Sequence, residues 1–307
     1  MIRSVLCRSF CYISAGALLG FLVVLTLFEG AFVCGTRPIS VKETSMKTRG
    51  IVVYVINLDR SPDRLRFVLP RVLQMRFPTE RISAIDGQRL SESDLDQYVD
   101  TDSFRVFQGY PPKRGEIGCS LSHFKAWEKF LQSSYRYALI VEDDITFPPE
   151  TLKAVVTELM DSSNDWDVVN FNLSRSATPL TLRSLKSYGK LVVYLKAFSC
   201  AGAYLINRQA AARLLTHAFP IKMPVDVMFT RGWEFDIKFT IIEPHLAHQT
   251  FGNSDIQRTT LLKQENAPIS LTFYLRKMSY KIKTHVMRFF YNLKMYLKES
   301  RYYSGDE

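Results

Sequence analysis

Short apolar runs alternate with stretches of helical character through the middle of the chain. The run IVVYVINL at 51–58 is β-branched and uncharged, which is typical of a buried strand. Ser61 followed by Pro62 is a typical helix start and predicts a helix over 61–75. Further strands are expected at 81–85, 137–141, 167–171, 191–195 and 201–206, and further helices at 120–132 and 207–217. This alternation predicts an α/β fold with a mostly parallel sheet, in which ligands bind beyond the carboxyl ends of the strands.

A longer apolar run lies near the beginning of the chain. Residues 9–28 are 20 uncharged, mostly apolar residues between Arg8 and Glu29. A helix of that length covers the roughly 30 Å hydrocarbon core of a bilayer, so the run predicts a transmembrane helix that anchors the protein. The alternative is a cleavable signal peptide, whose apolar region is usually shorter. Basic residues are more numerous after the run than before it, which favours a body on the cytoplasmic side.

The last part of the chain also has helical periodicity. Apolar residues recur there at steps of three and four: Leu271, Leu275, Met278, Ile282, Val286, Phe289 or Phe290, Leu293 and Leu297. Because Lys and Arg occupy the other faces, the segment predicts a basic amphipathic helix. Such a helix either lies on an anionic membrane or packs its apolar stripe on the domain. The predicted organisation is therefore an anchor at 1–33, a linker at 34–50, an α/β domain at 51–262 and the basic amphipathic segment at 263–307.

Composition and charge narrow the class of protein. Of the 307 residues, 47% are hydrophobic and 23% are charged, which is close to globular averages and excludes a wholly disordered chain. The net charge of +10 is uneven, because residues 274–301 hold eight Lys and Arg and a single acid. A nucleic-acid-binding protein would distribute its basic residues over a recognisable binding fold, so no nucleic-acid partner is expected. The basic segment predicts an anionic partner surface such as a membrane.

Glu142, Asp143 and Asp144 directly follow the strand expected at 137–141. Side chains two positions apart in an extended chain share one face, so Glu142 and Asp144 can converge while Asp143 points elsewhere. Clustered carboxylates repel each other, and a hard divalent cation such as Mn²⁺ or Mg²⁺ relieves the repulsion. The alternative is a solvated acidic turn. His248 is a further candidate ligand, for which a structural, hydrogen-bonded histidine is the alternative.

Two further groups of polar residues are expected at the same edge of the sheet. Arg60 and Arg64 follow the first strand and could hold a phosphate, and Asp86 follows the next strand and could accept a hydrogen bond from a ribose hydroxyl. The stretch GEIGCSLSH at 115–123 has the glycines of a loop that approaches a ligand closely. Surface ion pairs and an ordinary glycine-rich loop are the alternatives.

Six short segments closely resemble glycosyltransferase family 25. In chain order they are VINLDRSPDR, ISAIDG, GEIGCSLSH, ALIVEDD, AGAYLINRQAA and PVD. The family includes bacterial lipooligosaccharide galactosyltransferases and collagen galactosyltransferases, and the resemblance covers residues 51 to about 256. It implies that 51–262 is a catalytic domain of GT-A type, a Rossmann-like fold that binds a nucleotide sugar. It also implies a UDP-sugar donor, commonly UDP-galactose, dependence on Mn²⁺ and inversion at the anomeric carbon.

The resemblance assigns roles to individual residues. The acidic triplet looks like the family's version of the DxD motif, with Asp144 on the metal and Glu142 on the metal or the donor ribose. The donor-side positions implied in this way are Asn57, Arg60, Arg64, Asp86, Gly87, Ser120, His123 and Glu142. Inversion needs a base that takes the proton of the acceptor hydroxyl. Asp226, in the segment PVD, is the candidate base, with Glu116 and Asp143 as alternatives.

Three hypotheses for the function follow. The first is an inverting, metal-dependent galactosyltransferase that extends a surface glycolipid or oligosaccharide, such as lipooligosaccharide, at the cytoplasmic face of a bacterial inner membrane. The second is a lumenal galactosyltransferase of the Golgi or endoplasmic reticulum that acts on proteins or glycans. The third is a non-catalytic, membrane-bound sugar-binding protein on the same fold.

Overall fold

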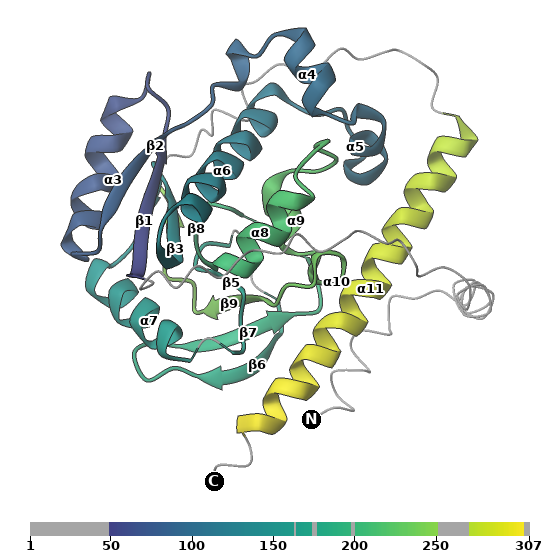
Figure 1. The fold of residues 1–307 in the computed structure, drawn as a ribbon. Coiled ribbons are helices and arrows are strands. Elements are labelled where there is room, and N and C mark those ends of the chain that lie inside the picture. Colours follow the sequence, from purple (N-terminus) through teal and green to yellow (C-terminus); the bar gives the residue numbers. More distant parts are fainter. Residues whose placement is uncertain (1–48, 163, 174–176, 198–199, 251–269, 304–307) are drawn as a thin grey trace. The chain divides into compact units, whose positions relative to one another are not determined.

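The centre of the computed structural model is an eight-stranded sheet with the strand order β2-β1-β3-β8-β5-β9-β7-β6 (Figure 1). The strands are β1 Arg49–Asn57, β2 Thr79–Ser83, β3 Tyr135–Glu142, β5 Val168–Asn170, β6 Pro179–Ser184, β7 Lys190–Tyr194, β8 Ala203–Asn207 and β9 Phe239–Glu243. β1 runs parallel to β2 and β3, and β5 runs parallel to β9. β8 is antiparallel to both β3 and β5, and β7 is antiparallel to β6 and β9. The α/β class is confirmed, and the sheet is mixed because β7 and β8 each run against their two neighbours.

The structure describes residues 49–162, 164–173, 177–197, 200–250 and 270–303. None of the helices in these ranges is both long enough and apolar enough to cross a bilayer. This finding corrects the expected location as a single-pass membrane protein. The apolar run at 9–28, from which that location was predicted, lies outside the described residues, as does the linker up to residue 48.

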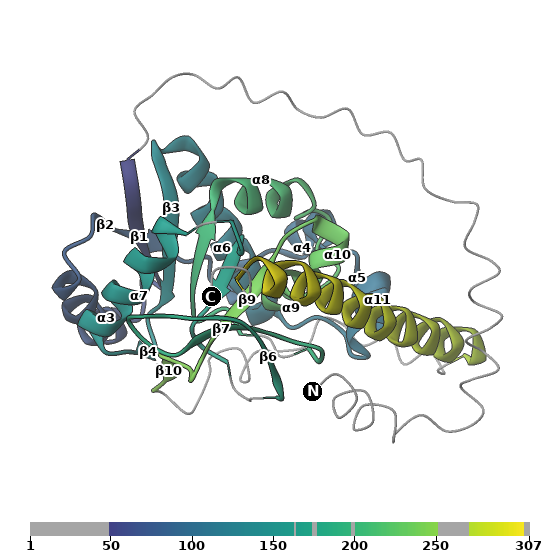
Figure 2. The same cartoon turned by 90° about the horizontal axis from the view of Figure 1, so that it is seen from below.

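Helices cover both faces of the sheet. In Figure 2, α3 (Pro62–Gln74) and α7 (Pro149–Asp161) lie on one side, and α6 (Arg114–Gln132) and α8 (Arg208–Thr216) lie on the other. Alternate residues of β1, Val52, Tyr54 and Ile56, pack with Phe124 and Trp127 of α6 in the main hydrophobic core. The remaining helices are η1 Gly87–Arg89, α4 Glu92–Tyr98, α5 Thr101–Gln108, α9 Val225–Phe229, α10 Gly232–Phe235 and α11 Leu271–Tyr303. A two-stranded sheet of β4 (Ile145–Thr146) and β10 (His248–Gln249) lies beside the end of β3.

The helix α6 begins at Arg114, six residues before the expected helix at 120–132. The stretch at 115–123 is therefore helical and not the predicted loop. Gly115 and Gly118 suggested a loop because glycine weakens a helix. Gly118 is needed for another reason: an added Cβ would lie 2.5 Å from the backbone nitrogen of Gly87. Close packing of this helix on the segment after β2 thus explains the glycine.

The predicted C-terminal helix is α11, which runs beside α5 and α10 (Figure 1). The start of its apolar stripe faces away from the domain, with Leu271 exposed by 73% and Leu275 by 58%. The opposite side makes the contacts: Tyr280 stacks on Phe107 with ring centroids 3.9 Å apart, and Arg288 is buried over the ring of Trp233. The interpretation that this part of the stripe packs on the domain is therefore wrong. Aromatic stacking and cation–π contacts hold the helix instead.

Candidate active site

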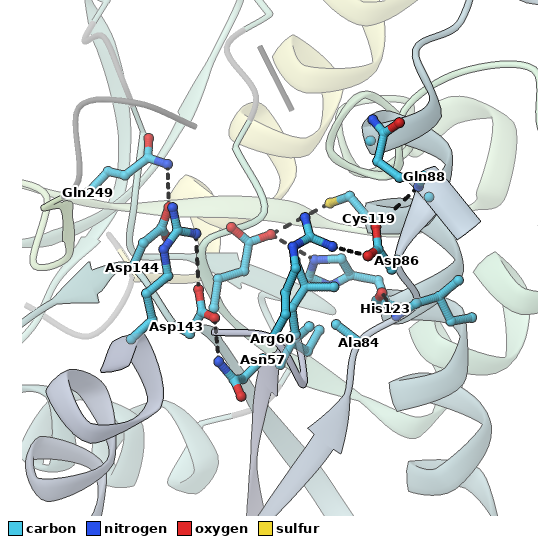
Figure 3. Close-up of a pocket in the computed structure, with 18 residues that line it drawn as sticks. Asn57, Arg60, Ala84, Asp86, Gln88, Cys119, His123, Asp143, Asp144 and Gln249 are labelled. Carbon is cyan, nitrogen blue, oxygen red and sulfur yellow. Dashed lines mark hydrogen bonds and ion pairs between the residues drawn. The ribbon is translucent and has the colours of Figure 1, made fainter. Parts of the chain in front are cut away.

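A pocket lies at the carboxyl ends of β1, β2 and β3 (Figure 3). Its walls come from the segments after these strands, from the first turns of α6, and from Gln249 of β10. Seven residues that sequence analysis placed on the donor side line it: Asn57, Arg60, Arg64, Asp86, Gly87, His123 and Glu142. Asp143 and Asp144 also line it. The structure thus brings together residues that are nearly 90 positions apart in the chain, at the sheet edge where ligands are expected.

Asp144 is the most deeply buried acid of the triplet, with 5% of the residue exposed. Its Oδ2 accepts a hydrogen bond of 2.7 Å from Nε2 of Gln249, while its Oδ1 is buried and has no hydrogen-bond partner among the described residues. Burial, followed by the negative charge of Glu142, raises the pKa of Asp144 to about 6. A buried carboxylate oxygen without a donor is costly, so this atom needs a ligand or a proton.

Asp143 is turned toward the other side of the pocket. Its Oδ2 accepts a hydrogen bond of 2.6 Å from Nδ2 of Asn57, and Nη1 of Arg64 lies 3.6 Å from its Oδ1. Burial raises the pKa of Asp143, while the hydrogen bond from Asn57 and the charge of Arg64 oppose the rise. Both of its oxygens are therefore used within the protein, in contrast to Asp144.

Glu142 is the last residue of β3 and lines the pocket. Its Oε1 lies 3.0 Å from Nε2 of His123 and 3.7 Å from Sγ of Cys119. Because Oε1 has these contacts, Oε2 is the oxygen that Glu142 can offer to a ligand. Glu142 and Asp144 together fit a hard divalent cation, since they combine two mutually repelling carboxylates with one unsatisfied buried oxygen.

The two arginines of the pocket have acidic partners. Arg60 forms an ion pair with Asp86, and the carboxylate of Asp86 also accepts a hydrogen bond of 3.1 Å from the backbone nitrogen of Gln88 at the start of η1 (Figure 3). Arg64 is close to Asp143. The surface ion pair named above as an alternative therefore exists for Arg60 and Asp86. It also holds both side chains at the mouth of the pocket.

Three predicted site residues, Glu116, Ser120 and Asp226, do not line the pocket. Glu116 accepts hydrogen bonds from the Tyr110 hydroxyl at 2.9 Å and from the Lys113 backbone nitrogen at 3.0 Å, which stabilises the first turn of α6. The Ser120 hydroxyl donates to the Glu116 carbonyl at 2.9 Å and accepts from the Val225 nitrogen at 3.2 Å. These hydrogen bonds link α6 to the start of α9, so both residues have a structural role in this geometry.

Asp226 lies in α9, outside the pocket lining but close to it. Burial, the charge of Glu142 and then the charge of Asp226 raise the pKa of the Cys119 thiol, and Cys119 lines the pocket. The same carboxylate also contributes to the raised pKa of Tyr110. Its negative charge thus reaches the side of the pocket formed by α6.

Three residues around the acidic triplet were not predicted from the sequence. Gln249 and not His248 contacts Asp144, because neighbouring residues of the strand β10 point to opposite faces. Tyr204 and Trp127 lie behind His123 and connect it to the core. Tyr204 belongs to the quoted segment AGAYLINRQAA, but no spacing along the chain indicates that β8 lies beside β3.

The chain matches known proteins in its sequence. The family model described as "Glycosyltransferase family 25 (LPS biosynthesis protein)" matches residues 51–229, more than half of the chain. Procollagen galactosyltransferase 1 of Danio rerio is 28% identical over 57% of this chain and 30% of that protein. A glycosyltransferase 25 family member of Aedes aegypti is 30% identical over 57% of this chain and 29% of its own length. Inactive glycosyltransferase 25 family member 3 of Mus musculus is 24% identical over 77% of this chain and 43% of its own length.

Solved structures give weaker similarities. Staphylococcus aureus TarS in complex with UDP-GlcNAc has a TM-score of 0.41 at 14% identity, covering 76% of this chain and 66% of that one. A Drosophila galactosyltransferase in complex with manganese, UDP-Gal and xylobiose has a TM-score of 0.36 at 11% identity, covering 71% and 78%. The chain also spans less than half the length of the three relatives named above. The match of the family model over 51–229 shows that the chain belongs to glycosyltransferase family 25.

Proposed function

We propose that the protein is an inverting glycosyltransferase of GT-A type that transfers galactose from UDP-galactose to a hydroxyl group of a glycan acceptor. The family membership and the relatives that are named galactosyltransferases support the reaction class. One observation carries the proposal: the buried Oδ1 of Asp144 has no partner among the described residues and lies in a pocket with Glu142 and two arginines. That arrangement suits a divalent cation and a diphosphate.

Asp144 and Glu142 would hold Mn²⁺ or Mg²⁺ by Oδ1 and Oε2. When bound, such a cation neutralises the negative charge that develops on a diphosphate leaving group. Arg60 and Arg64 would bind phosphate oxygens of the donor, since a guanidinium group donates two parallel hydrogen bonds to such an anion. Asp86, which forms an ion pair with Arg60, would accept a hydrogen bond from a donor hydroxyl.

Asp226 is the proposed base. Inversion by direct displacement needs a carboxylate that accepts the proton of the acceptor hydroxyl on the side opposite the leaving group. The candidate comes from the resemblance of the segment PVD to an acidic position of the family, and Oδ1 of Asp226 accepts a hydrogen bond of 2.9 Å from the backbone nitrogen of Val227. Asp226 lies near Cys119 on the α6 side of the pocket. An acceptor bound there would place its hydroxyl between Asp226 and the donor sugar.

The acceptor is proposed to be a glycolipid or oligosaccharide such as lipooligosaccharide. The description of the family as lipopolysaccharide biosynthesis proteins supports it. A protein acceptor is the second candidate, because relatives are named procollagen galactosyltransferases. A protein that binds a nucleotide sugar without transferring it is the third, since one relative is named inactive.

Calorimetric titration of UDP with and without Mn²⁺ tests the proposal. Binding should require Mn²⁺ in wild-type protein and should be lost in Asp144→Asn, while the surface variant Glu150→Gln should bind like wild type. Equal binding of UDP in Mn²⁺ and in excess EDTA would refute the metal-dependent site. A panel of UDP-sugars, with release of UDP followed in the presence of lipooligosaccharide or collagen peptide, then identifies the donor and acceptor. UDP binding without any release would favour the third candidate.

A further inference from the structure

A hydrogen-bonded chain of four side chains connects the core to the pocket. The Trp127 indole Nε1 lies 2.9 Å from the Tyr204 hydroxyl oxygen, which lies 2.9 Å from Nδ1 of His123. His123 Nε2 then lies 3.0 Å from Oε1 of Glu142. Trp127, Tyr204 and His123 are completely buried, and the chain ends at the pocket, which His123 and Glu142 both line. Figure 3 shows His123 among the residues that line the pocket.

The donor and acceptor capacities of these groups fix the position of each proton. An indole nitrogen can only donate, so the Tyr204 oxygen accepts from Trp127. The hydroxyl hydrogen of Tyr204 then has one acceptor within reach among the described residues, Nδ1 of His123. Because leaving a buried hydroxyl hydrogen without a partner is costly, Tyr204 donates to Nδ1. Nδ1 therefore carries no proton, and Nε2 of the neutral ring donates to Glu142.

The same side chains could instead be interpreted as a metal site. Ligand atoms of Cys119, His123 and Glu142 lie within 4.8 Å of one another. A cation bound to Nε2 of His123 would require the proton to be on Nδ1, directed at the Tyr204 oxygen. That oxygen would then accept from both Trp127 and His123, and its own hydrogen would have no acceptor among the described residues. The hydrogen-bonded chain is favoured over the metal site because it gives each of these buried hydrogens an acceptor.

We propose that Tyr204, supported by Trp127, is a positioning residue that holds His123 in the Nε2–H tautomer, so that His123 fixes Oε1 of Glu142 and leaves Oε2 for the ligand. A glutamate has three rotatable side-chain bonds, and an anchored oxygen spares the entropy of ordering them when a ligand binds. The effect on ligand binding rests on the proposed function. The tautomer itself is a property of the protein without any ligand.

NMR spectroscopy of wild-type protein labelled with ¹⁵N-histidine tests the tautomer directly. Long-range ¹H–¹⁵N correlations should show His123, assigned by its loss in His123→Gln, with the proton on Nε2. The proposal is overturned if the proton is on Nδ1, which is the pattern that metal ligation by Nε2 requires. In Tyr204→Phe the donor to Nδ1 is lost, so the Nδ1–H form should become populated. Tyr54→Phe removes another buried hydroxyl of the core, outside this chain, and should leave the pattern unchanged.

Binding of UDP in the presence of Mn²⁺ tests the positioning role. Tyr204→Phe should weaken it by about tenfold, the lower end of the effects of residues that orient metal ligands, and Tyr54→Phe should not. On the His123→Gln background the effect of Tyr204→Phe should disappear, because a side-chain amide has no tautomers and still donates to Glu142. An equal loss on both backgrounds would reduce Tyr204 to a packing residue and overturn the role. If wild-type protein binds no UDP, the proposed function fails, while the NMR result still decides the tautomer.

Discussion

The backbone of Gly118 in α6 packs against the backbone of Gly87 after β2. A Cβ at Gly118 would lie 2.5 Å from the Gly87 nitrogen and 2.7 Å from the Ile85 carbonyl oxygen. These are backbone atoms that cannot rotate away, unlike the end of a flexible side chain. The contact presses the N-terminal turns of α6, with Cys119 and His123, onto the segment that carries Asp86. One wall of the pocket therefore depends on glycine at both position 87 and position 118.

Gly118→Ala should destabilise the protein by about 1–3 kcal/mol, because the added methyl group forces α6 away from the segment 85–87. Gly50→Ala is the matched control, since nothing lies within 4 Å of a Cβ at that position. It should change the free energy of unfolding by no more than about 0.5 kcal/mol. Urea unfolding of both variants measures the difference, and equal stabilities would contradict the close contact.

Asp144→Asn should stabilise the metal-free protein at neutral pH. The pKa of Asp144 in the folded state, about 6, lies above its ordinary value of 3.8. The folded protein therefore favours the protonated form of Asp144. The stability of the fold is highest below pH 3.8, where Asp144 is protonated, and falls as the pH rises through 6 and the buried carboxyl group ionises. Relative to wild type, the variant should gain up to about 3 kcal/mol at pH 7.5 and much less near pH 4. Urea unfolding in EDTA at both pH values tests this, and a gain that does not depend on pH would contradict it.

Arg64→Ala and Arg60→Ala should each weaken binding of UDP by roughly tenfold, since a hydrogen bond to a charged group contributes about 1.5–3 kcal/mol. Binding of uridine, which has no phosphate, should change little. Arg66→Ala is the control, because Arg66 pairs with Asp63 on the exposed side of α3 and is not part of the pocket. Equal losses for UDP and uridine would assign the arginines to the fold and not to the phosphates.

The two candidate bases should respond differently to substitution. Asp226→Asn should lower kcat by about 10²- to 10⁴-fold, the usual contribution of general-base catalysis, with little change in the KM for the donor. Glu116→Ala should mainly lower the thermal stability, by about 1 kcal/mol, because it removes the acceptor of two hydrogen bonds at the start of α6. Steady-state kinetics and thermal unfolding of both variants separate these effects. A larger loss of kcat in Glu116→Ala would exchange the two roles.

Local patterns were sufficient to predict much of the fold. The apolar run of β1, the helix start at Ser61 and Pro62, and the acids at the end of β3 all depend on neighbours in sequence, and the structure contains each of them. The pocket was predictable in outline because strands of an α/β fold place their carboxyl ends together.

Contacts between distant segments could not be predicted. Gly118 suggested a loop, because its partner Gly87 lies 31 positions away and only the packed structure shows their contact. Tyr204 reaches His123 because β8 is inserted antiparallel to β3, a strand order that periodicity does not contain. The face of α11 that contacts the domain could not be predicted either. Hydrophobicity favoured the apolar stripe as the contacting face, whereas Arg288 and Tyr280 make the contacts.

The outward side of α11 has a consequence for the protein in concentrated solution. It presents the large apolar side chains Leu271, Tyr274, Leu275, Met278, Ile282, Phe290 and Leu297 to water, between rows of lysine. Like charges on colliding molecules keep such surfaces apart, and added salt screens that repulsion while hydrophobic attraction persists. Solubility should therefore fall as the ionic strength rises, which light scattering across a salt series would measure.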